Sequence, residues 1–126
     1  MIDSKFYICR HCGNVIGLIS NSGVPIVCCG EEMQCLVPNT TEAGQEKHLP
    51  VVNITGNKVN VAVGAVPHPM IVEHSIQWIY LETDQGGSRK CLNPNESPDV
   101  NFALCGEKPV AVYSYCNIHG LWKTEL

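Results

Sequence analysis

Apolar and polar residues alternate along much of the second half of the chain, with the period of two that is typical of β-strands. Lys58 to Val63 is the clearest case, and it can pair with Val51 to Thr55 across a Gly56-Asn57 turn to form a hairpin. Val100 to Leu104 alternates in the same way, and Ser88 to Leu92 and Val110 to Tyr115 are predicted as two further strands. This part of the chain is therefore predicted to be β-rich.

The longest strand candidate runs from Ile71 to Glu82. Its even positions, which include His74, Ile76, Trp78 and Tyr80, would lie on one face of a sheet. A histidine among bulky apolar residues is more often a hydrogen-bonded core residue than a metal ligand. His74 is therefore a candidate ligand only if other ligands converge on it.

Short strands with turn signals at regular spacing are typical of an antiparallel β-sandwich. No long amphipathic helix and no internal repeat are visible in the sequence. Between Leu36 and Gln45 the composition shifts to Pro, Asn, Thr, Glu and Gly, which indicates a linker. We therefore predict a mainly β protein with two domains. A small metal domain spans residues 1–36, and a seven-stranded antiparallel immunoglobulin-like β-sandwich spans residues 37–126.

Four cysteines near the N-terminus are predicted to form a tetrathiolate site. A short strand that begins at Phe6 leads into a Cys9-Arg10-His11-Cys12-Gly13 knuckle, which can place two thiolates on one metal. Val15 to Ser20 and Val24 to Val27 are predicted to form a hairpin that delivers Cys28-Cys29. Adjacent cysteines bond to each other only with strain, so these two are predicted to complete the site. The alternative is that these four cysteines form two disulfides. Zinc and iron both suit four thiolates, so the pattern does not distinguish the metal. His11, inside the knuckle, is interpreted as exposed.

Length and charge narrow the class of protein. A chain of 126 residues can bury one modest hydrophobic core and a small second core. The second core would need disulfides or a bound metal to be stable, and eight cysteines are present for this. The N-terminal residues contain no basic region followed by an apolar run, so we expect a cytoplasmic protein in which cysteines bind metal. No apolar stretch reaches membrane-spanning length. A net charge of −4 without a basic cluster argues against nucleic-acid binding.

A second candidate metal site lies in the C-terminal part of the chain. Cys116 and His119, three residues apart and followed by glycine, can aim a thiolate and an imidazole at one point. His48, His68 and His74 are predicted in loops or at strand edges of the same portion. Thiolate and imidazole together select a transition metal. The pattern predicts one metal held by four imidazoles and one thiolate, although each histidine alone could be an ordinary surface or core residue.

The triplet Glu46-Lys47-His48 precedes Leu49-Pro50. Pro50 biases Leu49 toward an extended conformation, so the triplet is predicted in a loop that enters a strand. Taken alone, it is most simply a solvated charge pair beside an ordinary histidine.

Together these motifs resemble those of the desulfoferrodoxin family, the two-iron form of superoxide reductase. Residues 6–35 look like its desulforedoxin domain. The resemblance to the catalytic iron centre is carried by Glu46-Lys47-His48, His68-Pro69-Met70, His74 and Cys116-Asn117-Ile118-His119-Gly120. The similarity extends over nearly the whole chain.

The resemblance implies two iron ions per chain, one FeCys4 and one FeHis4Cys. The first would be bound by Cys9, Cys12, Cys28 and Cys29, and the second by His48, His68, His74 and His119 in a plane with Cys116 as the axial ligand. Glu46 and Lys47 would be catalytic residues over the open face of the second iron. We also expect the amides of Ile118 and His119 to donate hydrogen bonds to the Cys116 sulfur.

Some positions depart from the family pattern. Ser114 stands where an acidic residue is frequent, and Leu121 stands where histidine is frequent. Neither change removes a ligand. Cys35, Cys91 and Cys105 match no ligand position and are interpreted as free, partly buried thiols.

The function implied is that of a superoxide reductase, an enzyme of oxidative-stress detoxification that reduces superoxide to hydrogen peroxide by one electron. A rubredoxin-like protein would return the iron to the ferrous state, and the family resemblance implies a homodimer. Two alternatives remain open from the residues: a non-catalytic iron electron-transfer protein and a zinc-stabilised interaction module.

Overall fold

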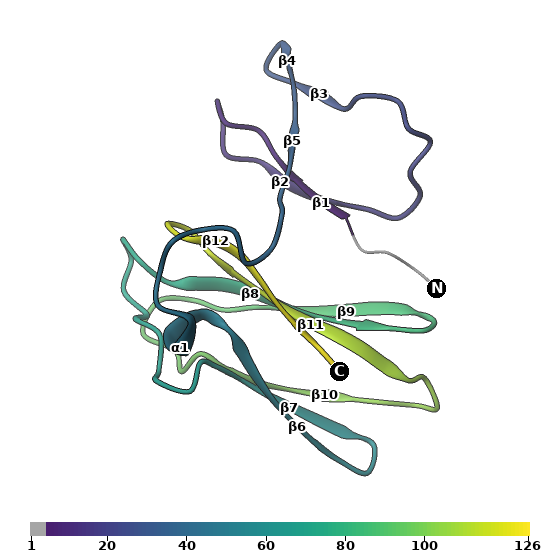
Figure 1. Ribbon diagram of the computed structural model, residues 1–126, viewed down its shortest axis with the longest axis vertical. Coiled ribbons are helices and arrows are strands. Elements are labelled where there is room, and N and C mark those ends of the chain that lie inside the picture. Colours follow the sequence, from purple (N-terminus) through teal and green to yellow (C-terminus); the bar gives the residue numbers. More distant parts are fainter. Residues whose placement is uncertain (1–4) are drawn as a thin grey trace. The chain divides into compact units, whose positions relative to one another are not determined.

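The computed structural model describes residues 5–126, which form two compact units (Figure 1). The first unit ends at Val37 and the second runs from Pro38 to Leu126. Residues 1–4, at the start of the predicted first domain, lie outside the described residues. The described chain is mainly β, as predicted, and its one α-helix, α1 (Gln45–His48), is a single turn. No helix in residues 5–126 is long and apolar enough to cross a lipid bilayer.

The second unit contains two antiparallel sheets, which lie one over the other in Figure 1. The three-stranded sheet has the order β10–β7–β6, with β6 (Pro50–Thr55), β7 (Lys58–Val63) and β10 (Asp99–Ala103). The four-stranded sheet has the order β12–β11–β8–β9, with β8 (Ile76–Thr83), β9 (Gly86–Cys91), β11 (Pro109–Cys116) and β12 (Gly120–Glu125). The prediction of a seven-stranded antiparallel sandwich is confirmed.

The core lies between these two sheets. Val59, Val61 and Val63 of β7 are fully buried, because alternate residues of this central strand face the other sheet. Burying each valine side chain contributes about 1.5–3 kcal/mol. The four-stranded sheet contributes Ile76, Ile79, Leu81, Val112 and Cys116 to the same cluster. One candidate metal ligand, Cys116, is therefore itself part of the core.

The predicted strand from Ile71 to Glu82 is wrong in its start and in its faces. Strand β8 begins at Ile76, and residues 71 to 74 instead form a turn closed by a bridge between Ile71 and His74. A bulge at the start of β8 skips Gln77, because Tyr115 pairs with Trp78 whereas Cys116 pairs with Ile76. The bulge reverses the alternation. Trp78 therefore does not share a face with the core residue Ile76, and His74 lies before the strand begins.

Strand β12 was not predicted. Leu121 and Trp122 are consecutive and both buried, so the segment lacks the alternation that marks a half-buried strand. It forms because Gly120, with φ +78°, turns the chain directly back onto β11. Without β12 the sequence pattern accounts for only part of the four-stranded sheet.

The predicted hairpin of Val15 to Ser20 with Val24 to Val27 is also wrong. In the first unit β2 (Val15–Leu18) pairs with β1 (Lys5–Ile8), and β1 also pairs with β5 (Gln34–Cys35). The turn between β1 and β2 is closed by hydrogen bonds from the Gly13 amide to the Cys9 carbonyl and from the Cys9 amide to the Asn14 carbonyl, both 2.9 Å. This tight turn returns the chain onto β1. Val27 belongs instead to β3 (Val27–Cys28), which pairs with β4 (Glu31–Glu32).

The Glu46-Lys47-His48 triplet lies in helix α1 and not in a loop as predicted. The Leu49 amide donates to the Gln45 carbonyl at 2.9 Å and closes the single turn. Leu49 itself is extended, with φ −67° and ψ 125°, in keeping with the constraint from Pro50. The turn leaves Glu46 and Lys47 exposed and buries His48.

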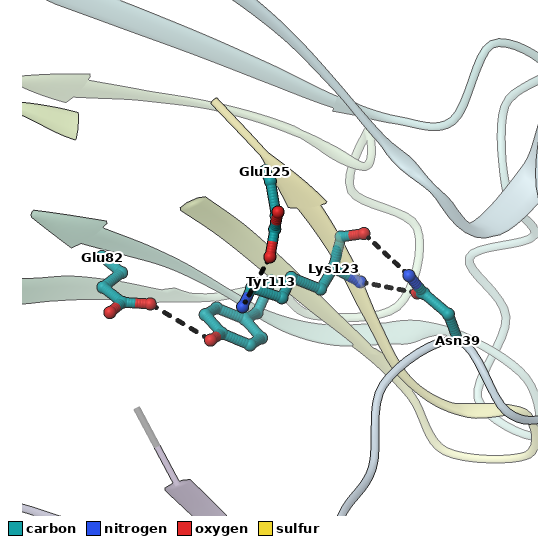
Figure 2. Close-up of polar contacts among 5 residues, drawn as sticks. All are labelled: Asn39, Glu82, Tyr113, Lys123 and Glu125. Carbon is teal, nitrogen blue, oxygen red and sulfur yellow. Dashed lines mark hydrogen bonds and ion pairs between the residues drawn. The ribbon is translucent and has the colours of Figure 1, made fainter. Parts of the chain in front are cut away.

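The start of the second unit is attached to the edge strand β12 by Asn39 (Figure 2). The Asn39 side chain donates to the Lys123 carbonyl at 3.1 Å and accepts from the Lys123 amide at 2.9 Å. Two further contacts lie nearby in Figure 2: Tyr113 donates to the buried Glu82 carboxylate at 3.1 Å, and Lys123 forms an ion pair with Glu125 at 3.3 Å. The Asn39 side chain thus pairs with the edge of β12 through the same two hydrogen bonds that a peptide group of a neighbouring strand would make.

Candidate metal centres

Two groups of side chains in the described residues could each hold a metal ion. In each group the candidate ligand atoms all lie within 4.8 Å of one another. One group consists of Cys9, Cys12, Cys28 and Cys29, and the other of His48, His68, His74, Cys116 and His119. The nine residues predicted as ligands are therefore brought together in two clusters, one in each unit.

The register of the strands gathers the histidine-rich cluster at one end of the sandwich. Pro50 pairs with Val63, so the start of β6 and the end of β7 coincide. Cys116 pairs with both Gly120 and Ile76, so β8, β11 and β12 meet at the same end. The five residues lie in α1, in the loops next to these strand ends and at the last residue of β11. Both sheets therefore contribute to the cluster.

Backbone carbonyls set the tautomers of two imidazoles. His48 Nδ1 lies 2.7 Å from the Gly44 carbonyl oxygen, and His68 Nδ1 lies 2.7 Å from the Pro69 carbonyl oxygen. A carbonyl can only accept, so each Nδ1 carries the proton and each Nε2 presents a lone pair when the ring is neutral. Such carbonyl contacts are the usual outer partners of metal-binding histidines.

Burial keeps these rings neutral. Burial is the main cause of the lowered pKa values of His48, His68 and His74, and it brings the pKa of His68 down to about 4. The neighbouring imidazoles lower all three pKa values further through their charge. At neutral pH these three rings are therefore neutral.

The ring nitrogens converge on one point. His48 Nε2 lies 3.2 Å from His68 Nε2 and 3.1 Å from His119 Nδ1. The Nε2 of His74 is buried and has no hydrogen-bond partner among residues 5–126. The Nε2 atoms of His48 and His68 both present lone pairs, which repel at this separation unless a cation lies between them, so the donor set fits a transition metal.

Cys116 adds a sulfur that is shielded from solvent, with 0% of the residue exposed. The His119 amide donates to the Cys116 sulfur at 3.3 Å, as expected, and such a bond reduces the electron density available from a thiolate. In the described chain the Ile118 amide makes no corresponding bond, so that part of the expectation is wrong. The turn therefore aims one amide, not two, at the sulfur.

Sequence reasoning missed two residues that hold His48. The Trp122 ring stacks on the His48 ring with centroids 4.9 Å apart and 23° between the planes, and its Nε1–H donates to the His119 carbonyl at 3.2 Å. The Ser114 hydroxyl donates to the His48 carbonyl at 3.0 Å, and both Ser114 and Trp122 are buried. These residues pair across β11 and β12. A tryptophan two residues after the motif glycine was the available signal.

Gly64 packs against helix α1 so closely that no side chain fits at this position. A Cβ atom on Gly64 would lie 2.7 Å from the Glu46 carbonyl oxygen and 3.0 Å from the Leu49 carbonyl oxygen. Real Cβ atoms do not approach other atoms at 2.7 Å, so any other residue would displace the turn. The absent side chain at Gly64 therefore determines where Glu46, Lys47 and His48 lie.

The charges of Glu46 and Lys47 shift the pKa values of histidines in the cluster, although both side chains are exposed. After burial and the imidazole charges, the Lys47 ammonium is a further cause of the lowered pKa of His74. The Glu46 carboxylate acts in the opposite sense on the pKa of His48. A positive and a negative group thus flank the imidazoles on the solvent side.

The thiols of Cys9, Cys12, Cys28 and Cys29 are free, so the alternative of two disulfides is wrong. Cys12 Sγ lies 3.6 Å from Cys28 Sγ. Backbone amides, first that of Cys12, lower the pKa of Cys9 to about 6, whereas hydrogen bonds to Cys12 and Cys9 raise the pKa of Cys29 to about 12. Sulfurs this close cannot all ionise without a cation between them. The group therefore fits a tetrathiolate metal site.

The remaining predictions concern His11 and the three cysteines outside the two ligand groups. His11 is exposed, as interpreted, and forms an ion pair with Glu31 at 3.0 Å. Cys35, Cys91 and Cys105 are free but exposed, so the prediction of partly buried thiols is wrong. Two of them lie on short or edge strands whose outer positions face solvent.

The sequence is similar to known proteins over nearly its whole length. The family described as Desulfoferrodoxin matches residues 40–125. A desulfoferrodoxin of Nitratidesulfovibrio vulgaris is 41% identical over 121 residues, which are 96% of this chain and 95% of that protein. A desulfoferrodoxin homolog of Archaeoglobus fulgidus is 42% identical over 95% of both chains.

The fold is similar to those of solved superoxide reductase structures. The superoxide reductase from Treponema pallidum has a TM-score of 0.83 and 34% identity, covering 98% of this chain and 100% of that one. The superoxide reductase (1Fe-SOR) from Giardia intestinalis has a TM-score of 0.55 and 32% identity, covering 64% of this chain and 99% of that one. The shorter structure thus corresponds to only part of this chain.

Proposed function

Because the chain belongs to the desulfoferrodoxin family, we propose that it is a superoxide reductase. The reaction takes one superoxide anion, one electron and two protons to one hydrogen peroxide molecule. The structural match to the superoxide reductase from Treponema pallidum supports this activity. The supporting relatives span the chain, so the proposal applies to both units.

The observation that carries the proposal is the convergence of four imidazoles and one thiolate at a single point. We propose that His48, His68, His74, Cys116 and His119 bind the catalytic iron. When bound, ferrous iron supplies the electron and a coordination position for the anion. Neutral imidazoles leave the charge of the ion intact, and one thiolate lowers it by one, so the site remains cationic.

The residues around the cluster would prepare the site for a small anion. The Lys47 ammonium adds positive potential on the solvent side and attracts superoxide despite the net charge of −4. We propose that Lys47 Nζ also orients a water that would supply a proton to the reduced superoxide. The His119 amide tunes the Cys116 sulfur, and Glu46 would bind the oxidised iron once the product has left.

We propose that Cys9, Cys12, Cys28 and Cys29 bind a second iron. Four thiolates suit an ion that is structural or transfers electrons. A redox donor must return the catalytic iron to the ferrous state after each turnover, and we propose a small rubredoxin-like protein for this role. A cytoplasmic location and a homodimeric state, both expected from the sequence, remain part of this proposal.

The test is metal analysis combined with pulse radiolysis of the reduced full-length protein. We expect two irons per chain and one hydrogen peroxide for each superoxide, with loss of the ferrous state and no dioxygen released. Dioxygen release would indicate dismutation. A colourless zinc protein would support the alternative of an interaction module. An iron protein whose visible spectrum does not change on addition of superoxide or azide would support a simple electron carrier.

A further inference from the structure

Asn117 makes three hydrogen bonds to the chain on both sides of His74. Its main-chain amide donates to the Ser75 carbonyl at 3.3 Å. Its side-chain Oδ1 accepts from the Ser75 amide at 3.0 Å, and its Nδ2 donates to the Glu73 carbonyl at 2.9 Å. One exposed side chain thus binds the residue before His74 and the residue after it.

These bonds continue a sheet beyond its last strand pair. Strands β8 and β11 end their pairing at Ile76 and Cys116, and Asn117 is the next residue. Its carboxamide presents the same acceptor and donor as a peptide group, so it supplies the hydrogen bonds of an additional strand residue. The turn that contains Cys116 and His119 is thereby joined to the turn that contains His74.

His74 differs from two other ligand candidates in how its ring is held. His48 and His68 are each fixed by a carbonyl oxygen 2.7 Å from Nδ1. Among residues 5–126, no hydrogen bond fixes the ring of His74, which lies edge-on to the rings of His68 and His119. Its direction therefore depends on its backbone, and that backbone is the part that Asn117 holds.

We propose that Asn117 is a positioning residue that aims His74 at the catalytic metal. The proposal rests on the metal site of the proposed function, but it concerns the geometry of one ligand and not the reaction. Asn117 touches neither substrate nor metal in this account. It acts through His74, and it couples that ligand to the two on the opposite turn.

The test is Co²⁺ binding to the metal-free full-length chain, followed by the thiolate-to-cobalt absorption of the histidine-rich site. We expect Asn117→Ala to weaken this site about 10- to 100-fold, the usual cost of losing an outer partner. Asn117→Leu, which preserves volume, should behave in the same way. Co²⁺ uptake by the four cysteines of the first unit is the internal standard and should not change.

A double-mutant cycle with His74→Ala separates positioning from general damage. If Asn117 acts through His74, then Asn117→Ala costs little further affinity once His74 is alanine. Equal losses in both backgrounds, or wild-type Co²⁺ affinity in Asn117→Ala, would overturn the proposal. Asn60→Ala, which removes amide hydrogen bonds to Asp99 and Asn101 away from the cluster, is the matched control.

The proposed function can fail without this inference failing. A wild-type chain that binds Co²⁺ through the cluster but whose iron form ignores superoxide would remove the reductase activity and leave the positioning role intact. Conversely, normal superoxide reduction with normal Co²⁺ affinity in Asn117→Ala would remove only the positioning role.

Discussion

At the scale of single residues, proton positions decide whether the imidazoles can bind a metal. The carbonyls of Gly44 and Pro69 hold the Nδ1 protons of His48 and His68, which leaves Nε2 of each ring as the ligand atom. Burial then prevents a second proton from binding at neutral pH. The Nε2 lone pairs of His48 and His68 therefore face each other in the metal-free cluster, and a cation between them relieves their repulsion.

Burial of the imidazoles predicts that the metal-free protein loses stability in acid. The pKa of His68 is about 4 in the folded chain against 6.5 as its ordinary value, and those of His48 and His74 are lowered too. Between these values the unfolded chain binds protons that the folded chain does not, so stability is full above pH 6.5 and falls toward pH 4. Urea unfolding across this range measures it. His68→Gln should flatten the slope, and an unchanged slope in that variant would contradict the assignment.

Among residues 5–126, Cys116 is the one thiol among the candidate ligands of the histidine-rich cluster. We expect Cys116→Ser to abolish the thiolate-to-iron charge-transfer band and most of the superoxide reactivity, because a hydroxyl is a far weaker electron donor than a thiolate. Visible spectroscopy and pulse radiolysis of the iron form measure both. Cys105→Ser, which changes an exposed thiol, is the control. Retention of the band in Cys116→Ser would remove Cys116 from the ligand set.

Lys47 contributes charge rather than coordination in the proposed mechanism. Lys47→Ile should slow the reaction with superoxide by about tenfold while the iron content stays unchanged, and the salt dependence of the rate should decrease. Pulse radiolysis at several ionic strengths tests this. Lys108→Ile, at an exposed lysine distant in sequence, should leave the rate unchanged. An equal rate in both variants would exclude Lys47.

At the scale of elements, helix α1 is too short to hold a ligand by itself. One helical turn without a side-chain cap is unstable alone, because nucleation fixes several residues for one hydrogen bond. Here the sheets supply what the helix lacks. Ser114 and Trp122 hold His48 from β11 and β12, and Gly64 allows the close approach of the turn.

We predict that Gly64→Ala displaces α1 and impairs the cluster without affecting the first unit. The added methyl group overlaps the Glu46 carbonyl oxygen, so the turn must move, at a cost of about 1–3 kcal/mol in stability. The expected results are a lower melting temperature and weaker metal binding by the histidine-rich cluster. Calorimetry and Co²⁺ titration measure them, with uptake by the four cysteines as the internal reference. Unchanged values for both would show that the turn adapts freely.

At the scale of the whole molecule, each unit has its own metal ligands and its own small set of buried residues. The first unit buries Phe6, Ile8, Cys9, Met33 and Leu36. So few apolar residues rarely stabilise a fold alone, and metal binding then becomes part of the folding free energy. The second unit has a continuous core between two sheets and does not depend on metal to the same degree.

This division predicts independent metal sites. Cys9→Ser should lower the iron content from two to one per chain and disorder the first unit, whereas the rate of superoxide reduction by the remaining iron should persist. Elemental analysis, amide exchange and pulse radiolysis measure these three effects. The loss of both irons together would show that the units do not bind metal separately.

The sequence by itself determined the class of fold and the composition of the two clusters. Alternation in residues 58–63 identified a strand from local pattern alone, and short motifs such as Cys9 to Cys12 carry the thiolate spacing that a metal requires. Resemblance added the pairing of these motifs with distant histidines. Such features depend on residues close in sequence or on whole motifs, so they can be read without coordinates.

Only the tertiary structure decided the faces, the supports and the final contacts. The bulge at Gln77, the stacking of Trp122 on His48 and the bonds of Asn117 around His74 each join residues far apart in the chain. No local pattern encodes them, because a strand register and a ring contact depend on which partner folds alongside. The sequence therefore named the side chains of the clusters, and the packing of two sheets decided how they are aimed.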